Sequence, residues 1–183
     1  MTIVRPILKI THFADLQHGD FFVYEHAHGR SVALKVRDPR MDYPDLALPL
    51  GPDFPADRAG PHLYQAPRAT VISFGKNVLV RLPPEPRGWT TSPPPLSCSC
   101  ILSIGGSSAS SPPTCYFRAN CQQVSDASGE CYIDVFDGTI FTSGSGVGMA
   151  FAKPTGAMAF ATEWELFTSE DEPWLILDYQ WQP

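Results

Sequence analysis

Apolar and polar residues alternate along several short segments of the chain, with the period of two that is typical of a half-buried β-strand. The clearest alternation lies in residues 30–38, where Val32, Leu34 and Val36 share one face of the predicted strand. A second apolar segment, residues 21–24, precedes it across the turn-like stretch EHAHG. This pattern predicts a β-hairpin.

A second hairpin is predicted from two alternating segments that flank a glycine. Residues 69–74 and 77–82 are joined by Gly75-Lys76. A glycine at the first loop position favours a type II′ turn, whose backbone twist matches that of the flanking strands.

The strongest local signal in the chain is the dipeptide Asp137-Gly138. It joins residues 131–136 to residues 139–143, both of which have a strand-like composition. Because this dipeptide favours positive backbone angles, we predict a two-residue type I′ turn with Gly138 at positive φ. Residues 147–167 are predicted to continue from this hairpin as a meander.

The high frequency of glycine and proline along the chain predicts the fold class. With 14 glycines and 19 prolines among 183 residues, no helix of ten or more residues fits between them. We therefore predict an all-β fold, an antiparallel β-sandwich or barrel built from hairpins and a meander, with long Pro-rich loops. The chain is long enough for one core. We expect a single domain over 1–183, with possible sub-structure at 1–82 and 97–183 joined by a Pro-rich crossover, 83–96.

Residues 38–67 form the longest stretch without clear periodicity. Loops of this length in compact domains usually carry function or cover an open end of the fold. If the protein has a site, we expect this loop to form part of its walls.

All five cysteines lie close together in the sequence and, once assigned to strands, fall on apolar faces. They are Cys98, Cys100, Cys115, Cys121 and Cys131. Packing as small buried side chains explains them, and their spacing lacks the paired C-x-x-C pattern of zinc sites, so we predict no metal site. Five is an odd number and nothing indicates export, which favours reduced thiols over disulfides.

The charge and hydropathy of the chain exclude two classes of partner. The formal net charge is −6, and Lys and Arg are scattered singly, which argues against nucleic acid. No apolar run approaches the roughly 20 residues that span a bilayer, and the first residues do not resemble a secretory signal, so we expect no membrane and a cytoplasmic protein.

Two pairs of residues could in principle bind a metal or act in catalysis, but both have simpler structural interpretations. His26 and His28 sit in a predicted turn, where solvated imidazoles are more common than metal ligands. Glu163 and Glu165 flank Trp164 in a predicted strand, which is the pattern of an edge strand with one wet face rather than of a glycosidase pair.

Known catalytic signatures are missing from the sequence. It contains no G-x-S-x-G, P-loop or H-E-x-x-H, so we assign no catalytic or binding residue and no cofactor. Active sites on β scaffolds often combine distant residues, however, and Asp20, His62, Glu163 or Asp178 could converge in the fold.

The C-terminal segment 174–181 suggests a function. Leu175, Leu177, Tyr179 and Trp181 would share one face of a strand whose other face begins with further apolar residues. Because a terminal edge strand offers unpaired backbone groups, we predict a non-enzymatic binding or assembly module that pairs with another protein or with itself. The alternatives are a hydrolase-type enzyme with a cleft under loop 38–67 and a metal-binding protein.

Overall fold

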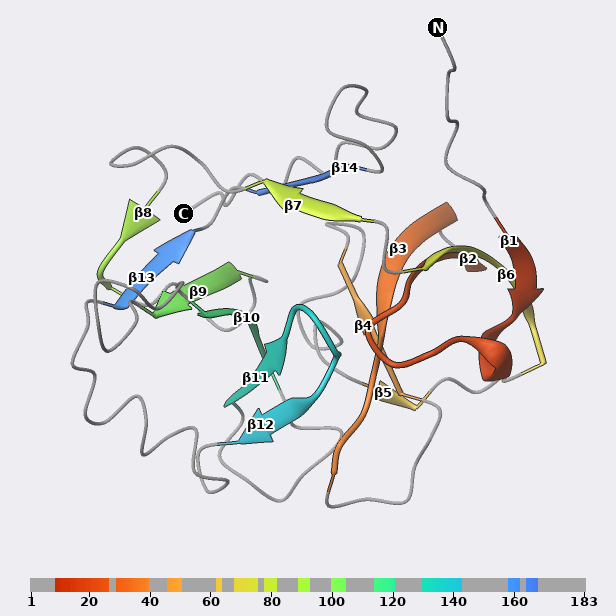
Figure 1. The fold of residues 1–183 in the computed structure, drawn as a ribbon, viewed down its shortest axis with the longest axis horizontal. Coiled ribbons are helices and arrows are strands. Elements are labelled where there is room, and N and C mark those ends of the chain that lie inside the picture. The colour runs from red at the N-terminus through yellow and green to blue at the C-terminus, as the bar shows by residue number, and fades with distance from the viewer. Residues whose placement is uncertain are drawn as a thin grey trace, which may run out of the picture.

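The computed structural model describes part of the chain, and all statements about structure below concern that part. It comprises residues 9–26, 29–39, 46–50, 62–63, 68–75, 78–81, 89–92, 100–104, 114–120, 130–142, 158–161 and 164–167. These residues form antiparallel β-sheets and one short 3-10 helix, η1 (Phe13–Asp15), which confirms the all-β prediction (Figure 1). Within them, no helix has the length and apolar character needed to cross a membrane.

The first sheet has six strands in the order β1-β6-β2-β3-β4-β5. Its strands are β1 (Lys9–His12), β2 (Phe21–His26), β3 (Gly29–Val36), β4 (Leu46–Pro49), β5 (His62–Leu63) and β6 (Thr70–Gly75). The hairpin predicted from the alternation around Val32 is confirmed, because β2 pairs antiparallel with β3 from Phe21↔Leu34 to His26↔Gly29.

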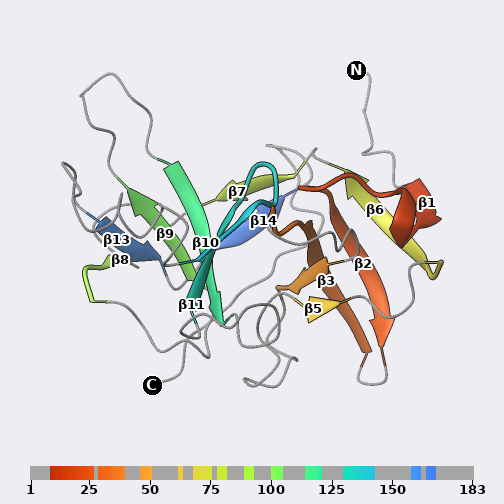
Figure 2. The same cartoon turned by 90° about the horizontal axis from the view of Figure 1, so that it is seen from below.

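The second sheet also has six strands, in the order β12-β11-β10-β9-β13-β8, and a separate pair joins β7 to β14. The strands of the second sheet are β8 (Trp89–Thr90), β9 (Cys100–Ile104), β10 (Thr114–Asn120), β11 (Glu130–Asp134), β12 (Ile140–Thr142) and β13 (Met158–Ala161). The pair consists of β7 (Leu79–Arg81) and β14 (Glu165–Phe167). Figure 2 shows the two larger sheets side by side, with β7 and β14 between them.

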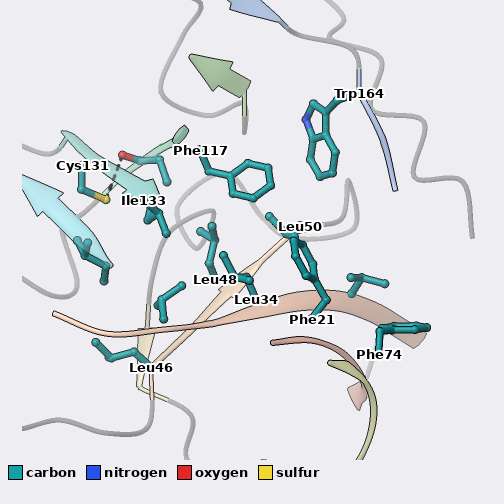
Figure 3. Packing of buried hydrophobic residues seen from close by; sticks show 14 of the residues in the cluster. Phe21, Leu34, Leu46, Leu48, Leu50, Phe74, Phe117, Cys131, Ile133 and Trp164 are labelled. Carbon is teal, nitrogen blue, oxygen red and sulfur yellow. Dashed lines mark hydrogen bonds between the residues drawn. The ribbon is translucent and has the colours of Figure 1, made fainter. Parts of the chain in front are cut away.

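One hydrophobic core is shared by residues of both large sheets (Figure 3). From the first sheet, Phe21 and Leu34 are buried in it, and from the second, Phe117 and Ile133. Trp164, which directly precedes β14, packs on Phe117 with ring centroids 5.2 Å apart. The alternation of apolar residues in each strand thus brings one face of each sheet into the same buried cluster.

The other face of the first sheet is also buried, under η1. Phe13 of η1 packs edge-on against Phe22 at 5.2 Å between ring centroids. Lys35, only 3% exposed, donates hydrogen bonds from Nζ to the carbonyl oxygens of Phe13 (3.1 Å) and Ala14 (3.3 Å). Its ammonium also lies 4.7 Å from the centre of the Phe13 ring, a cation–π contact. A buried charge therefore holds η1 against the sheet.

The described part of region 38–67 differs from the prediction. Instead of one long loop, it contains β4 and β5, and β4 pairs with β3 and β5. Leu46, Leu48 and Leu50 are buried in the shared core. The prolines around this segment masked a short, continuously apolar strand, the kind that a sheet buried on both faces requires.

The predicted hairpin around Gly75 is wrong. Gly75 does have positive φ (60°), but β6 pairs with β1 and β2, whereas β7 pairs with β14. Val78 and Val80 contact the shared core, so burial of these residues rather than the turn decides where β7 lies.

The predicted meander over 147–167 is also wrong in its described part. β13 is separated from β12 by three strands in the second sheet and pairs with β9 and β8. The crossover 83–96 supplies β8 to the second sheet, and β7, from the first half of the chain, pairs with β14, from the second half.

Candidate functional site

The connection between β11 and β12 is a tightly hydrogen-bonded turn of four residues, 135–138. Two backbone hydrogen bonds close the ends of the turn. The Asp134 amide donates to the Thr139 carbonyl (2.9 Å), and the Gly138 amide donates to the Asp134 carbonyl (3.0 Å). Within it, the Phe136 amide donates to Asp134 Oδ1 at 2.7 Å, and the Thr139 amide donates to Asp137 Oδ1 at 2.8 Å. These bonds fix the backbone on both sides of the turn.

The hairpin predicted at Asp137-Gly138 is therefore confirmed, but not its turn type. β11 pairs antiparallel with β12, and Gly138 has φ +70° as predicted. No non-glycine residue in the described part has positive φ, so Asp137 does not adopt the conformation that a type I′ turn requires. The Asp137 carboxylate instead caps the Thr139 amide, as Asp side chains often do in longer turns.

This turn also joins the two large sheets. The Arg37 amide donates to the Gly138 carbonyl (2.9 Å) and the Ile140 amide to the Arg37 carbonyl (2.8 Å), which gives a parallel bridge between Arg37 and Thr139. Gly19 and Gly138, both at positive φ, lie in close approach: a Cβ on Gly138 would be 2.5 Å from the Lys35 carbonyl oxygen and 2.9 Å from the Gly19 nitrogen. Backbone packed this closely leaves no space for a side chain at either glycine.

The side chains of Arg37, Thr139 and Asp137 form a polar cluster on the turn. Arg37 Nε donates to Thr139 Oγ1 at 3.0 Å, and Arg37 Nη2 lies 3.2 Å from Asp137 Oδ2. Burial alone would raise the pKa of Asp137, but the hydrogen bonds from Thr139 and the charge of Arg37 outweigh it and hold that pKa below its ordinary value. Asp137 is therefore ionised at neutral pH and held in place.

Tyr116 lies close to this cluster, on β10. Its ring packs edge-on against Phe141 with centroids 6.0 Å apart. Burial raises the pKa of Tyr116 above its ordinary value, and the negative charges of Asp134 and Asp137 raise it further. At neutral pH its hydroxyl is therefore protonated and can donate a hydrogen bond.

The most exposed side chain of the turn is aromatic. Phe136 is 86% exposed, although its own amide donates to Asp134 Oδ1 and the next residue, Asp137, accepts from the Thr139 amide. Among the described residues, the other large apolar side chain with high exposure is Ile10 on β1, at 74%. A hydrogen-bonded turn that presents an aromatic ring, with an ionised Asp137 and Arg37 next to it, can bind a surface in which charged groups surround an apolar group.

The cysteine predictions can be tested in part. Cys131 is fully buried in the shared core, Cys115 is partly buried against it, and neither is in a disulfide, which confirms the packing interpretation for these two. Cys100 pairs with Arg118, which is itself buried, and Ile101 pairs with the core residue Phe117. The prediction for the Cys100 side chain stays untested, because that side chain lies outside the described part. Cys98 and Cys121 lie outside the described residues.

The residues proposed to converge into an active site are not brought together where the structure describes them. Asp20 lies directly before β2, where its Oδ2 accepts a hydrogen bond from the Gln17 amide at 2.8 Å. His62 is in β5, which β3 and β4 separate from β2 in the first sheet. Glu163 and Asp178 lie outside the described residues, as does the C-terminal segment 174–181.

Metal ligation has no candidate in the described residues, where no group of three or more His, Cys, Asp or Glu side chains is arranged to hold an ion. His26 ends β2, and His28 lies outside the described part.

Sequence reasoning missed Phe136 as an exposed residue because it was assigned to a strand. Its position immediately before Asp137-Gly138 was the available signal, since residues next to such a dipeptide commonly belong to the turn. Comparisons with known proteins supply no relative from which a role could be transferred: no family model, curated protein or solved structure matches the chain.

Proposed function

We propose that this protein is a non-enzymatic β-rich binding module, which associates with another polypeptide chain through the turn between β11 and β12. The observation that carries the proposal is the 86% exposure of Phe136 on a turn fixed by hydrogen bonds. Aromatic side chains, phenylalanine included, are enriched at protein–protein interfaces, whereas a ring exposed to water is unfavourable.

The energetics favour a binding role for this residue. Burying a phenylalanine side chain stabilises a complex by about 1.5–3 kcal/mol, provided that ordering the surrounding chain costs little. Here the Phe136 amide is already bonded to Asp134, and Asp137 is bonded to Thr139 and Arg37, so the backbone is ordered before the partner arrives. The ion pair between Asp137 and Arg37 is half-exposed. At the rim of the proposed interface it would orient the partner more than it would raise the binding affinity.

The architecture that we propose for this module is a β-sandwich, in which the two large sheets pack face to face. Support comes from the shared core, to which both sheets contribute buried residues. The bridge between Arg37 and Thr139 sits where the sheets meet, so the turn is attached to both of them. A binding residue on such a scaffold keeps its position.

A binding role is preferred to the hydrolase alternative because of region 38–67. That alternative needed this region as the roof of a cleft. Its described strand β4 instead places Leu46, Leu48 and Leu50 in the core.

Photo-crosslinking tests the proposal. Benzoylphenylalanine is placed at position 136 in one variant and, in a matched control, at the exposed Thr91, which directly follows β8; crosslinked peptides are identified by mass spectrometry. We expect position 136 to crosslink to one identified polypeptide, in competition with excess wild-type protein but not with Phe136→Ser. Yields at position 136 no higher than those at position 91, or adducts that wild-type protein does not compete away, would overturn it.

A further inference from the structure

The outer edge of β1 carries backbone groups that no described strand binds. β1 is the terminal strand of the first sheet, where its one described partner is β6 (Figure 1). The Phe13 amide donates to the Ala69 carbonyl at 3.1 Å. Because hydrogen-bonded pairs alternate along an antiparallel ladder, Thr11 also bonds to β6. The amide and carbonyl groups of Ile10 and His12 therefore point away from β6, toward the open edge.

A row of apolar side chains crosses the first sheet and ends at this edge. Residues paired across neighbouring strands lie on the same face, and the register pairs Ile10 with Ile72 and Ile72 with Val23. The row continues from Val23 to Val32, whose carbonyl accepts a hydrogen bond from the Leu50 amide at 2.9 Å. Val32 is 3% exposed in the shared core, whereas Ile10 is 74% exposed. The face that forms the core thus extends to an uncovered apolar side chain.

The shape of this edge defines what would cover it. A further strand would bond to the outward amide and carbonyl groups, and its side chains would extend both faces of the sheet. On the face of Ile10, an apolar side chain would lengthen the row. On the opposite face, Thr11 is partly buried and pairs with Val71, which is buried under η1. The segment that fits is therefore an extended one with apolar residues on both of its faces.

The C-terminal segment 174–181, WLILDYQW, has this pattern. Four apolar residues share one of its faces as a strand, and two begin the other: Leu175, Leu177, Tyr179 and Trp181, then Trp174 and Ile176. The residues before it, TSEDEP at 168–173, are polar and end in a proline, a composition typical of a connection. The segment lies outside the described residues, so its sequence is what matches the edge.

Strand pairing limits the distance between the end of β14 and β1. Phe167 pairs with Leu79. Leu79 follows Ser73 by six residues, and Ser73 pairs with Lys9. Since an extended chain spans at most about 3.6 Å per residue and paired residues lie about 5 Å apart, Phe167 is at most roughly 33 Å from Lys9. Residues 168–183 span up to about 55 Å when extended, so they reach β1 of the same molecule.

We propose that segment 174–181 of the same chain adds a strand at the open edge of β1. Its backbone bonds to the outward groups of Ile10 and His12, and its apolar side chains cover Ile10. A tethered segment has a high effective concentration at the edge, which favours the same molecule over a second copy. The added strand protects this edge from pairing with other chains, and this role is independent of the one proposed for Phe136.

Amide hydrogen exchange of the whole chain, followed by NMR, tests the proposal. In the wild type we expect slow exchange at Ile10 and His12. In the double variant Leu175→Ser/Leu177→Ser, both amides should exchange at least about tenfold faster, because the added strand loses two buried leucines. Thr11, bonded to β6, should keep its slow exchange, which shows that the sheet itself is intact. The matched control Asp178→Ser/Gln180→Ser replaces two polar residues of the same segment and should exchange like the wild type.

Three results would overturn the inference. The first is fast exchange at Ile10 and His12 in the wild type, which would mean that the edge is open. The second is an equal acceleration in the control variant, which would mean that the apolar residues of the segment do not cover the edge. The third comes from mixing isotope-labelled Leu175→Ser/Leu177→Ser protein with excess unlabelled wild type. Slow exchange restored in the labelled chain would identify the segment of a second copy as the occupant.

Discussion

Replacing Gly138 with alanine should destabilise the protein more than the same change at Gly75, although both glycines have similar positive φ. Gly138 has φ +70° and Gly75 has φ +60°, so the backbone penalty for a non-glycine residue is about the same, roughly 1–2 kcal/mol. The space around them differs. A Cβ on Gly75 meets nothing within 4 Å, whereas one on Gly138 would lie 2.5 Å from the Lys35 carbonyl oxygen.

The difference between the two variants measures the cost of that clash. The Lys35 carbonyl is backbone that accepts a hydrogen bond from the Gly19 amide at 2.8 Å, so it cannot rotate away as a flexible side chain would. Forcing an extra group into well-packed structure typically costs about 1–3 kcal/mol. Gly138→Ala should therefore lose roughly 2–5 kcal/mol in total, against roughly 1–2 kcal/mol for Gly75→Ala.

Urea denaturation followed by circular dichroism provides the measurement. With a slope of about 2 kcal/mol per molar urea, an additional 2 kcal/mol lowers the midpoint by about 1 M. Gly19→Ala belongs in the same series, because its Cβ would lie 2.7 Å from the Phe136 carbonyl oxygen. Equal midpoints for Gly138→Ala and Gly75→Ala would refute the close approach between the turn and the first sheet.

Three further predictions concern the same junction and the core. The pKa of Asp137 is lower in the folded protein than its ordinary value of 3.8, so its carboxylate stabilises the fold above that pH, and the effect is lost as the pH falls through the folded pKa. Asp137→Asn should therefore cost about 1 kcal/mol or less at pH 7, since the pair with Arg37 is half-exposed, and denaturation curves should converge with those of the wild type at acidic pH; a constant difference would contradict this. Cys131 is fully buried, so a thiol reagent followed by peptide mass spectrometry should modify it much more slowly than Cys115, and equal rates would contradict its place in the core. Because both large sheets share one core, tryptophan fluorescence and circular dichroism should report a single coincident unfolding transition, whereas two separated transitions would indicate independent halves.

Local signals in the sequence were sufficient for the elements that depend on neighbouring residues. The alternation around Leu34 predicted β3 and the face that reaches the core, since side chains alternate in any strand whatever it pairs with. Asp137-Gly138 predicted the hairpin between β11 and β12 and the positive φ of Gly138, because that conformation is a property of glycine itself.

Strand partners and buried apolar runs could not be read in the same way. Nothing near Gly75 indicates that β7 pairs with β14, more than 80 residues later, because the choice depends on which placement buries Val78 and Val80. Leu46 and Leu48 lie in a proline-flanked segment without alternation. The absence of alternation is explained only by the structure, in which β4 pairs within the first sheet and is buried on both faces.

The candidate site depended on tertiary structure for the same reason. Composition revealed an acidic, β-rich chain, but the exposure of Phe136 and Ile10 follows from what the fold leaves uncovered. Arg37 and Asp137 are 100 residues apart, and no local pattern links them; they meet because the close approach of Gly19 and Gly138 allows β3 to run beside the β11–β12 turn. Conformational preferences of single residues are encoded locally, whereas contacts between distant segments depend on which apolar side chains are buried together in the folded chain.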